Sequence, residues 1–201
     1  MSRRKKVIAI IGTYRKGGIV DTAVDEILGS AAEQGAEVSR IYLTDVHIEF
    51  CTNCRACARQ PGQNRGMCPI PDDMSAVLDR IEQSDAVVLA SPMNFWTVTA
   101  IMKRFIERLV CYAYWPWGMM APKVRNEEKT RRAVVVASSA APAFLARLTT
   151  RMVGLLKNAA ALLGAGTVGV LFIGLAARKE HPDIGSRARR KARSLGRKLV
   201  S

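Results

Sequence analysis

The sequence has few of the side chains that most enzymes use to move protons. It contains only two histidines, His47 and His181, which lie far apart in the chain, and we interpret each as a surface or structural residue. It has no Gly-x-Ser-x-Gly nucleophile motif, no His-Glu-x-x-His metal motif and no Walker loop. The sequence therefore argues against the enzyme classes that carry these motifs, and it offers no candidate catalytic acid or base.

A long apolar run that would cross a membrane is also lacking. Segment 159–177 has nineteen residues without a charge, which is long enough for a span, but it contains four glycines. We interpret it as a helix end, a glycine turn and a strand buried on both faces. Near the N-terminus, the basic residues 3–6 precede an apolar run, 7–11, that is too short for a signal peptide. We therefore expect a cytoplasmic protein with no membrane span.

Acidic residues are scarce, with 17 Asp and Glu against 31 Lys and Arg, and the formal net charge is +14. Such a charge can favour binding to a polyanion such as nucleic acid, or to a membrane surface. Most of the excess, however, lies in two segments, 3–6 and 187–198. Apolar residues recur at helical spacing through 184–200, which predicts an amphipathic helix with a solvated basic face. We favour that interpretation and expect no nucleic-acid partner, with nucleic-acid or membrane-surface binding as the alternative.

What the sequence does contain is a regular alternation of short apolar runs and helical patterns. At 201 residues the chain is long enough for one core and short for two, so we expect a single domain, 1–201. The apolar runs predict strands at 7–11, 38–43, 86–90, 133–137 and 168–173. Helical periodicity predicts helices at 19–31, 74–81, 98–109, 144–162 and 184–200. This order predicts an α/β fold with a parallel, doubly wound sheet and helices on both faces.

In a doubly wound sheet, ligands bind beyond the carboxyl ends of the strands. The loops to consider follow the first, third and fourth strands, at 12–20, 91–96 and 138–142. The first loop follows a strand and opens a helix, where backbone N–H groups and the helix dipole can bind phosphate. It also supplies the Thr13 hydroxyl and the Arg15 charge, although an ordinary turn between strand and helix is the alternative. A Gly-x-Gly-x-x-Gly sequence at 164–169 has the wrong polarity for a dinucleotide, because it follows a helix and enters a strand.

Several short motifs occur in an order and spacing that is similar to one known family. They are Gly12-Thr13-x-Arg15-x-x-Gly18, Asp72-Asp73-Met74, Asp85-Ala-Val-Val, Ser91-Pro92-x-Asn94-Phe95 and Lys103-Arg104-Phe105-Ile106-Glu107-Arg108. Across about residues 5–175, this pattern resembles the NADPH-dependent FMN reductase family. The resemblance implies a flavodoxin-like three-layer sandwich whose five parallel strands have the order 2-1-3-4-5. It also implies bound FMN, NAD(P)H as electron donor, a small-molecule acceptor such as flavin or quinone, and a homodimer or dimer of dimers.

By the same resemblance, the three loops supply the cofactor-binding residues, with the phosphate on the first loop and the flavin ring between the other two. The implied residues are Thr13, Arg15, Lys16, Gly17, Gly18, Ile19 and Val20; Pro92, Met93, Asn94, Phe95 and Trp96; and Ser138, Ser139 and Ala141. No catalytic side chain is implied, because the flavin itself accepts hydride at N5. The chain departs from many relatives at Ile19-Val20, where they carry an Asn-Thr pair. That change removes side-chain donors to the phosphate and leaves the backbone donors.

Five cysteines in a chain expected to be cytoplasmic indicate free thiols, a metal or cluster site, or redox chemistry. Loop 47–71 holds most of them, in a Cys-x-x-Cys-x-x-Cys opening and a Cys-Pro ending made by Cys51, Cys54, Cys57 and Cys68. That pattern is typical of cluster-binding ferredoxin sequences, and it resembles the iron–sulfur flavoprotein branch of the same fold. The ten-residue gap before Cys68 is longer than in those cluster binders. A [4Fe–4S] cluster, zinc and reduced thiols all stay open, and we interpret Cys111 as a core residue.

Segment 112–130 is unusually aromatic for a loop, with Tyr112, Tyr114, Trp115 and Trp117 close together. It could form a satellite core, a wall over the flavin or a subunit contact, and we favour an interface combined with a substrate pocket. The favoured function is an FMN-dependent oxidoreductase that uses NAD(P)H. The alternatives are an electron carrier with a [4Fe–4S] cluster beside FMN, and a basic protein that binds nucleic acid or a membrane surface on the same fold.

Overall fold

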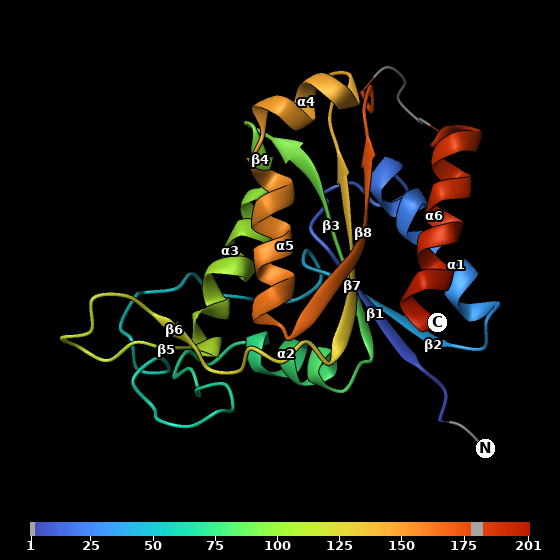
Figure 1. The fold of residues 1–201 in the computed structure, drawn as a ribbon. Coiled ribbons are helices and arrows are strands. Elements are labelled where there is room, and N and C mark those ends of the chain that lie inside the picture. Colours follow the sequence, from blue (N-terminus) through green and yellow to red (C-terminus); the bar gives the residue numbers. More distant parts are fainter. Residues whose placement is uncertain (1–2, 178–182) are drawn as a thin grey trace.

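The computed structural model describes residues 3–177 and 183–201, so His181 lies outside the described residues. One sheet carries the fold (Figure 1). Its five long strands are parallel and have the order β2 (Glu37–Tyr42), β1 (Lys6–Ile11), β3 (Ala86–Asn94), β7 (Arg131–Ser138) and β8 (Ala165–Ile173). Counted along the chain this is 2-1-3-4-5, which confirms the predicted topology. A short strand that was not predicted, β4 (Thr97–Val98), pairs antiparallel with the end of β3.

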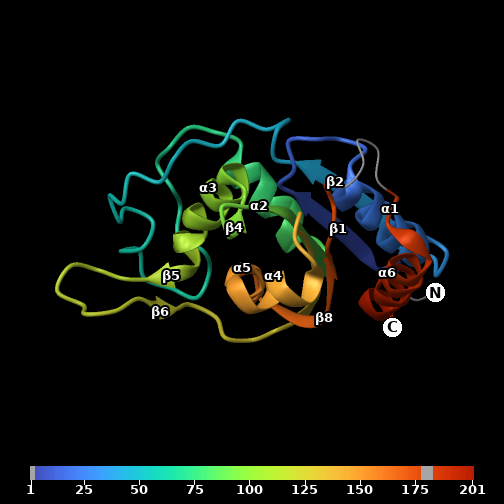
Figure 2. The same cartoon turned by 90° about the horizontal axis from the view of Figure 1, so that it is seen from above.

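Helices cover both faces of the sheet, as Figures 1 and 2 show. One face carries α1 (Ile19–Ala32) and α6 (Gly185–Val200), and the other carries α2 (Met74–Glu82), α3 (Ala100–Arg108) and α5 (Met152–Leu162). Along β1, Val7, Ala9 and Ile11 face the first layer, whereas Ile8 and Ile10 face the second, and all five are buried. Strands buried on both faces are apolar at every position, which is why the sequence revealed them as short continuous runs.

The predicted helix 144–162 is wrong in one respect, because the structure divides it in two. α4 (Ala143–Thr149) stops at Thr150, whose backbone is extended, and α5 begins at Met152. The Thr150 hydroxyl accepts the Met152 N–H at 3.1 Å, and it thereby supplies a partner that a continuous helix would have taken from its own backbone. As a result α4 lies over the carboxyl edge of the sheet, at the top of Figure 1.

The uncharged segment 159–177 folds as predicted into a helix end, a turn and a strand. The strand is not buried on both faces as predicted, because β8 is at the edge of the sheet and most of its residues are only half-buried. α5 ends at Leu162, Gly164 adopts a φ of +68°, and β8 follows directly. Throughout residues 3–177 and 183–201, no helix is long and apolar enough to cross a membrane.

The basic helix α6 is amphipathic, as the spacing of its apolar residues predicted. Ala192, Leu195 and Leu199 are buried in the core that this helix shares with α1 and the sheet. On its polar side, Arg193 pairs at 2.7 Å with Glu33, the C-cap residue of α1. Part of the basic face is therefore paired with an acidic face of α1.

A small appendage lies beyond the C-terminal end of α3. After the 3-10 turn η1 (Leu109–Tyr112), strands β5 (Ala113–Tyr114) and β6 (Lys123–Val124) form a separate antiparallel pair. Both views place this pair beside the cysteine loop, on the side of the molecule away from α1 and α6 (Figures 1 and 2). The Trp115 N–H donates to Ala58 O at 2.7 Å, and the Gly66 N–H donates to Cys111 O at 2.9 Å. The aromatic segment and the cysteine loop thus form one unit.

Candidate functional site

A cavity of about 390 Å³ lies where the loops after β1, β3, β7 and β8 meet, at the carboxyl edge of the sheet. This volume is within the range of small-molecule and cofactor sites. The predicted residues that line it are Thr13, Arg15, Gly18, Ile19 and Val20; Pro92, Met93 and Asn94; and Ser138 and Ser139. Predicted residues outside the lining are Lys16, Gly17, Phe95, Trp96 and Ala141.

The lining also includes Tyr14, Ala140, Ala176 and Ala177, which the sequence reasoning missed. Ala176 and Ala177 follow β8, the fifth long strand of the parallel sheet. The rule that ligands gather beyond the carboxyl ends of strands applies to this strand as well, so the same signal could have found them. We call this site the edge cavity.

The N-terminus of α1 opens into the edge cavity without a side-chain cap. Its N-cap residue is Gly18, which has an extended backbone and makes no side-chain capping hydrogen bond. A Cβ at Gly18 would lie 3.2 Å from Arg15 O, and Gly17 has a φ of +73°, so this tight loop favours glycine at both positions. The first N–H groups of the helix and its dipole are therefore available to an anion.

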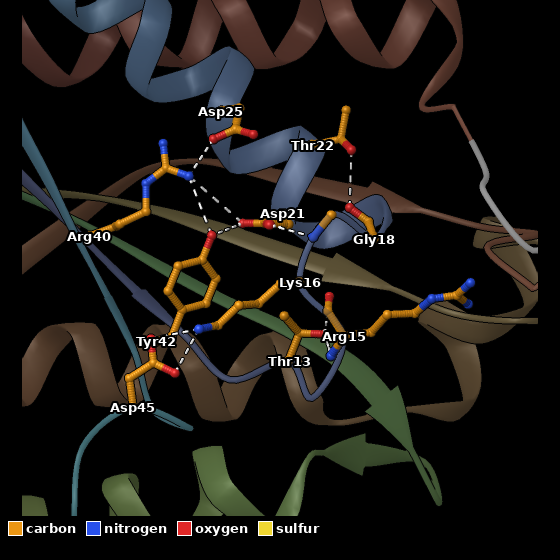
Figure 3. A network of polar contacts seen from close by, with 11 residues as sticks. Thr13, Arg15, Lys16, Gly18, Asp21, Thr22, Asp25, Arg40, Tyr42 and Asp45 are labelled. Carbon is orange, nitrogen blue, oxygen red and sulfur yellow. Dashed lines mark hydrogen bonds and ion pairs between the residues drawn. The ribbon is translucent and has the colours of Figure 1, made fainter.

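The loop before α1 is held by the polar network in Figure 3. The Gly17 N–H donates to Asp21 Oδ2 at 2.7 Å, and the Tyr42 hydroxyl donates to Asp21 Oδ1 at 2.6 Å. Burial and the hydrogen bond to Asp21 raise the pKa of Tyr42. Arg40 lies 4.0 Å from Asp21 and 2.6 Å from Asp25, so a cation balances the buried carboxylate. Asp21 thus supports the loop without being part of the cavity lining.

Lys16 belongs to the same network rather than to the edge cavity. Its ammonium group lies 2.7 Å from the carboxylate of Asp45 and 4.8 Å from the centre of the Tyr42 ring. Figure 3 shows the side chains of Lys16 and Arg15 pointing in opposite directions from the loop. The structure therefore gives these neighbouring cations different surroundings.

Hydroxyl groups connect the other walls of the edge cavity. Thr99 Oγ1 donates to Gly12 O at 2.6 Å, and the Thr99 N–H donates to Ser91 Oγ at 3.1 Å. A Cβ at Gly12 would lie only 2.7 Å from Met102 Cβ, so α3 can pack this close to β1 only because residue 12 is glycine. The Ser139 hydroxyl donates to Ala141 O at 2.7 Å and shapes the loop after β7. The Thr99 contacts thus fix the loops after β1 and β3 relative to each other, and the Ser139 contact holds the loop after β7 in its own conformation.

Exposed apolar side chains gather beside the edge cavity. Phe95 (φ +45°) and Trp96 (φ +61°) make the turn between β3 and β4, a backbone conformation that bulky residues rarely adopt. Their side chains are 91% and 65% exposed. The Thr150 hydroxyl donates to Trp96 O and so connects this turn to the end of α4. We call the exposed side chains of this region the edge patch: Phe95, Trp96, Phe144, Leu145 and Leu148.

A second cavity, of about 280 Å³, lies in the appendage, and we call it the cysteine cavity. Cys51, Cys54, Cys57 and Cys68 all line it. Burial raises the pKa of the Cys57 thiol, and the other three cysteines raise it further, which reflects their proximity. The Ala56 N–H lowers the pKa of the exposed Cys54 thiol by hydrogen bonding to it. Cys111 is buried in the core as predicted, and burial raises its pKa to about 12.

The aromatic segment forms a wall of the cysteine cavity. The Arg55 guanidinium lies 3.6 Å from the centre of the Trp115 ring and 4.2 Å from that of Trp117. Arg125 binds the loop from beneath, and its three donor nitrogens reach Cys57 O, Gly62 O and Cys111 O at 2.9–3.0 Å. Among the described residues, no three His, Cys, Asp or Glu side chains are arranged to hold a single metal ion. A cavity of this volume between four thiols instead suits a group of several atoms.

Comparison with known proteins assigns the chain to a family. Residues 5–176 match the model of the NADPH-dependent FMN reductase family. An iron–sulfur flavoprotein of Archaeoglobus fulgidus is 36% identical over 111 residues, which cover 55% of this chain and 48% of that protein. An iron–sulfur flavoprotein of Methanocaldococcus jannaschii is 35% identical over 103 residues, 51% of each protein. The chain thus spans about half the length of the curated relatives it matches.

Solved structures share the fold over almost the whole chain. An FMN-dependent NADH-azoreductase from Bacillus anthracis, in complex with FMN, superposes with a TM-score of 0.73 at 12% identity, covering 99% of this chain and 100% of that one. An NAD(P)H:quinone oxidoreductase from Methanothermobacter marburgensis gives a TM-score of 0.70 at 16% identity, covering 98% and 100%. These likenesses confirm the flavodoxin-like α/β architecture that the family resemblance implied.

Proposed function

The chain belongs to the NADPH-dependent FMN reductase family, a family of FMN-dependent oxidoreductases, and from that premise we propose that it binds FMN in the edge cavity and oxidises NAD(P)H. The observation that carries the proposal is the convergence of three predicted loops on one cavity that contains the uncapped N-terminus of α1. A helix N-terminus without a capping side chain suits a phosphate monoester. In this proposal residues 1–201 act as one FMN-binding domain.

The phosphate is held by the Thr13 hydroxyl, the Arg15 guanidinium and the backbone N–H groups at the start of α1. Lys16 and Gly17 contribute by shaping the loop, because the Lys16 ammonium group and the Gly17 N–H each donate to a carboxylate. Apolar walls from Pro92 and Met93 suit the flavin ring, and the remaining predicted contacts are Ile19, Val20, Asn94, Phe95, Trp96, Ser138, Ser139 and Ala141.

When bound, FMN supplies the redox chemistry, because its N5 atom accepts hydride. The protein holds and orients the ring, limits water around it and leaves one face open to the donor and then to a small-molecule acceptor such as a flavin or quinone. No protein acid or base is required for hydride transfer to the flavin. This agrees with an edge cavity whose lining contains no Asp, Glu or His among the described residues.

A single spectrum followed by a titration tests this proposal. We expect the protein purified from cells, or loaded with FMN, to show flavin absorption and to oxidise NADH or NADPH when an acceptor is present. Comparing the two nucleotides identifies the donor, and a series of flavins and quinones identifies the acceptor. A folded protein that cannot be loaded with FMN would contradict the proposal.

A second function is favoured by the four cysteines that line one cavity: an electron carrier in which a [4Fe–4S] cluster exchanges electrons with FMN. The thiols of Cys51, Cys54, Cys57 and Cys68 would be its ligands. Two curated relatives that share about half of the chain are named iron–sulfur flavoproteins. Zinc is less favoured, because these cysteines are not arranged around one ion.

Iron and acid-labile sulfide analysis after anaerobic purification tests the second function. We expect about four of each per chain, together with a broad thiolate-to-iron absorption beside the flavin bands. Cys54→Ser should abolish that absorption, whereas Cys111→Ala, which changes a cysteine outside the cavity, should keep it. Flavin bands without iron in the wild-type protein would leave the FMN proposal standing and reject the cluster.

We also propose that the protein is a cytoplasmic homodimer, or a dimer of dimers, in which the edge patch is covered by a second copy. The support is the position of five exposed apolar side chains beside the edge cavity. Exposed apolar groups in one place are typical of interaction surfaces.

A further inference from the structure

We propose that Arg108 is a positioning residue for the Cys68 thiolate and that it raises the reduction potential of the cluster in the cysteine cavity. This inference rests on the iron–sulfur function proposed above. Arg108 is the last residue of α3, and its side chain is only 2% exposed. It is one of two arginines that line the cysteine cavity, the other being Arg55.

Arg108 joins both ends of the cysteine loop. One of its terminal nitrogens donates to Glu49 O at 2.8 Å, two residues before Cys51. The other donates to Cys68 Sγ at 3.4 Å. The guanidinium is also paired with Asp72, which follows Cys68 by four residues and is itself 1% exposed. A single side chain therefore closes the loop and faces the sulfur of its last cysteine.

Asp72 orients this guanidinium through a dense set of bonds. Its carboxylate accepts N–H groups from Glu49 at 2.8 Å and from Met74 at 3.0 Å, in addition to the two bonds from Arg108. Burial opposes the charged form of Asp72, but these hydrogen bonds outweigh it and lower its pKa. A buried ion pair gives little net stability over a well-packed apolar pair, so its presence beside a cysteine suggests a role in positioning.

The direction of the effect on the cluster follows from charge. Reduction adds one electron, and so one negative charge, to a cluster that four thiolates already make anionic. N–H···S hydrogen bonds and a nearby cation stabilise the more negative state, which raises the reduction potential. Asp72 largely cancels the positive charge of Arg108. The N–H···S bond is therefore the main contribution of Arg108 to the reduction potential of the cluster.

The other arginines near the cavity lack this contact. Arg125 uses its donor nitrogens on three backbone carbonyls, as described above. Arg55 is stacked on two indole rings at the wall. Arg55→Gln therefore serves as a charge control, because it removes a positive charge from the lining of the same cavity at a place where the structure records no bond to sulfur. The double variant leaves the net charge unchanged, so a shift of its midpoint potential reports the loss of the N–H···S bond and not a loss of charge.

The test is a redox titration with dithionite, followed by electron paramagnetic resonance for the cluster and by absorption for FMN. Two variants are compared with the wild-type protein: Arg108→Lys, and the double variant Arg108→Gln with Asp72→Asn, which avoids an unpaired buried carboxylate. At the wild-type midpoint potential we expect the reduced-to-oxidised ratio of the cluster to fall roughly threefold to tenfold in the double variant. Arg108→Lys should recover part of that loss, and the FMN midpoint should stay unchanged in all.

The possible outcomes distinguish a failure of the inference about Arg108 from a failure of the proposed iron–sulfur function. A folded double variant that binds FMN but loses its iron would support the positioning role of Arg108. A full cluster with the wild-type midpoint in the double variant would overturn the inference and keep the iron–sulfur function. A wild-type protein without iron after anaerobic reconstitution would overturn both.

Discussion

At the scale of single residues, Arg15 and Lys16 are adjacent cations with different surroundings. Arg15 lines the edge cavity, whereas Lys16 is 2.7 Å from Asp45 on the far side of the loop. From sequence alone the two are indistinguishable, because both are basic residues in a loop that suits phosphate. They differ because Lys16 is bonded to Asp45, a residue 29 positions away that lies just after β2. Only tertiary structure reveals that pairing.

This difference predicts that two neighbouring variants lose FMN affinity to unequal extents. Arg15→Ala should weaken FMN binding by about threefold to tenfold, because an exposed charge-assisted hydrogen bond to phosphate is worth roughly 1 kcal/mol. Lys16→Ala removes the same formal charge but breaks only an exposed ion pair with Asp45, which contributes little to the stability of the loop, so it should change the affinity less than twofold. Titration of each apoprotein with FMN, followed by flavin fluorescence, measures both. Equal losses in the two variants would show that general positive charge, and not the Arg15 contact, holds the phosphate.

At the scale of secondary structure elements, the sequence predicted the five long strands and most helices, because each is recorded in local residue patterns. From Val7 to Ile11, for example, β1 is buried on both faces and every residue is apolar. The division of the helix at Thr150 was not predictable in this way, because the surrounding apolar periodicity continues across it. The division depends on two hydrogen bonds of the Thr150 hydroxyl, which accepts the Met152 N–H and donates to Trp96 O. These bonds compete with the backbone hydrogen bonds of a continuous helix. The second partner, Trp96, lies 54 residues away.

The candidate site was predictable to a similar extent. Three loops at the carboxyl edge were correctly brought together, since parallel strands point their ends the same way. The role of the aromatic segment was not apparent, because stacking of Arg55 between Trp115 and Trp117 requires two distant loops to meet. The structure places these two indole rings on the cysteine cavity and not on the edge cavity.

Helix packing allows a second prediction, based on two glycines of neighbouring helices. Gly196 of α6 lies against α1, where an added Cβ would be 2.2 Å from Ile27 O. Gly196→Ala should therefore lower the free energy of unfolding by about 1–3 kcal/mol, because backbone atoms must move apart. Gly29 of α1 has nothing within 4 Å of such a Cβ, so Gly29→Ala should raise the free energy of unfolding by about 0.5–1 kcal/mol. Urea denaturation of both variants tests the pair, and destabilisation by Gly29→Ala would contradict this packing.

At the scale of the whole molecule, the net charge of +14 suggests a polyanion partner, but its placement argues against one. Arg193 pairs with Glu33, and Arg189 lies 3.2 Å from Glu26, so α1 neutralises part of the basic face of α6. Remaining cations are spread over a solvated helix. We predict that binding to duplex DNA is weaker than about 10 µM at about 0.15 M salt, as for non-specific contacts. Fluorescence anisotropy over a salt series checks this, and tight binding with a steep salt slope would instead support the nucleic-acid function.

The edge patch provides the last prediction, which concerns assembly. Phe144 and Leu148 are four residues apart in α4 and are 72% and 82% exposed, a costly arrangement for a monomer in water. If a second copy covers them, the double variant Phe144→Ser, Leu148→Ser should shift the protein from dimer to monomer in sedimentation velocity while circular dichroism stays unchanged. Met120→Ser is the control, since Met120 is fully exposed but lies in the appendage, and it should leave the dimer intact. Because the patch borders the edge cavity through Phe95 and Trp96, the monomeric double variant should also bind FMN more weakly. A dimer that withstands the double variant would assign the interface to another surface and leave the patch to a different partner.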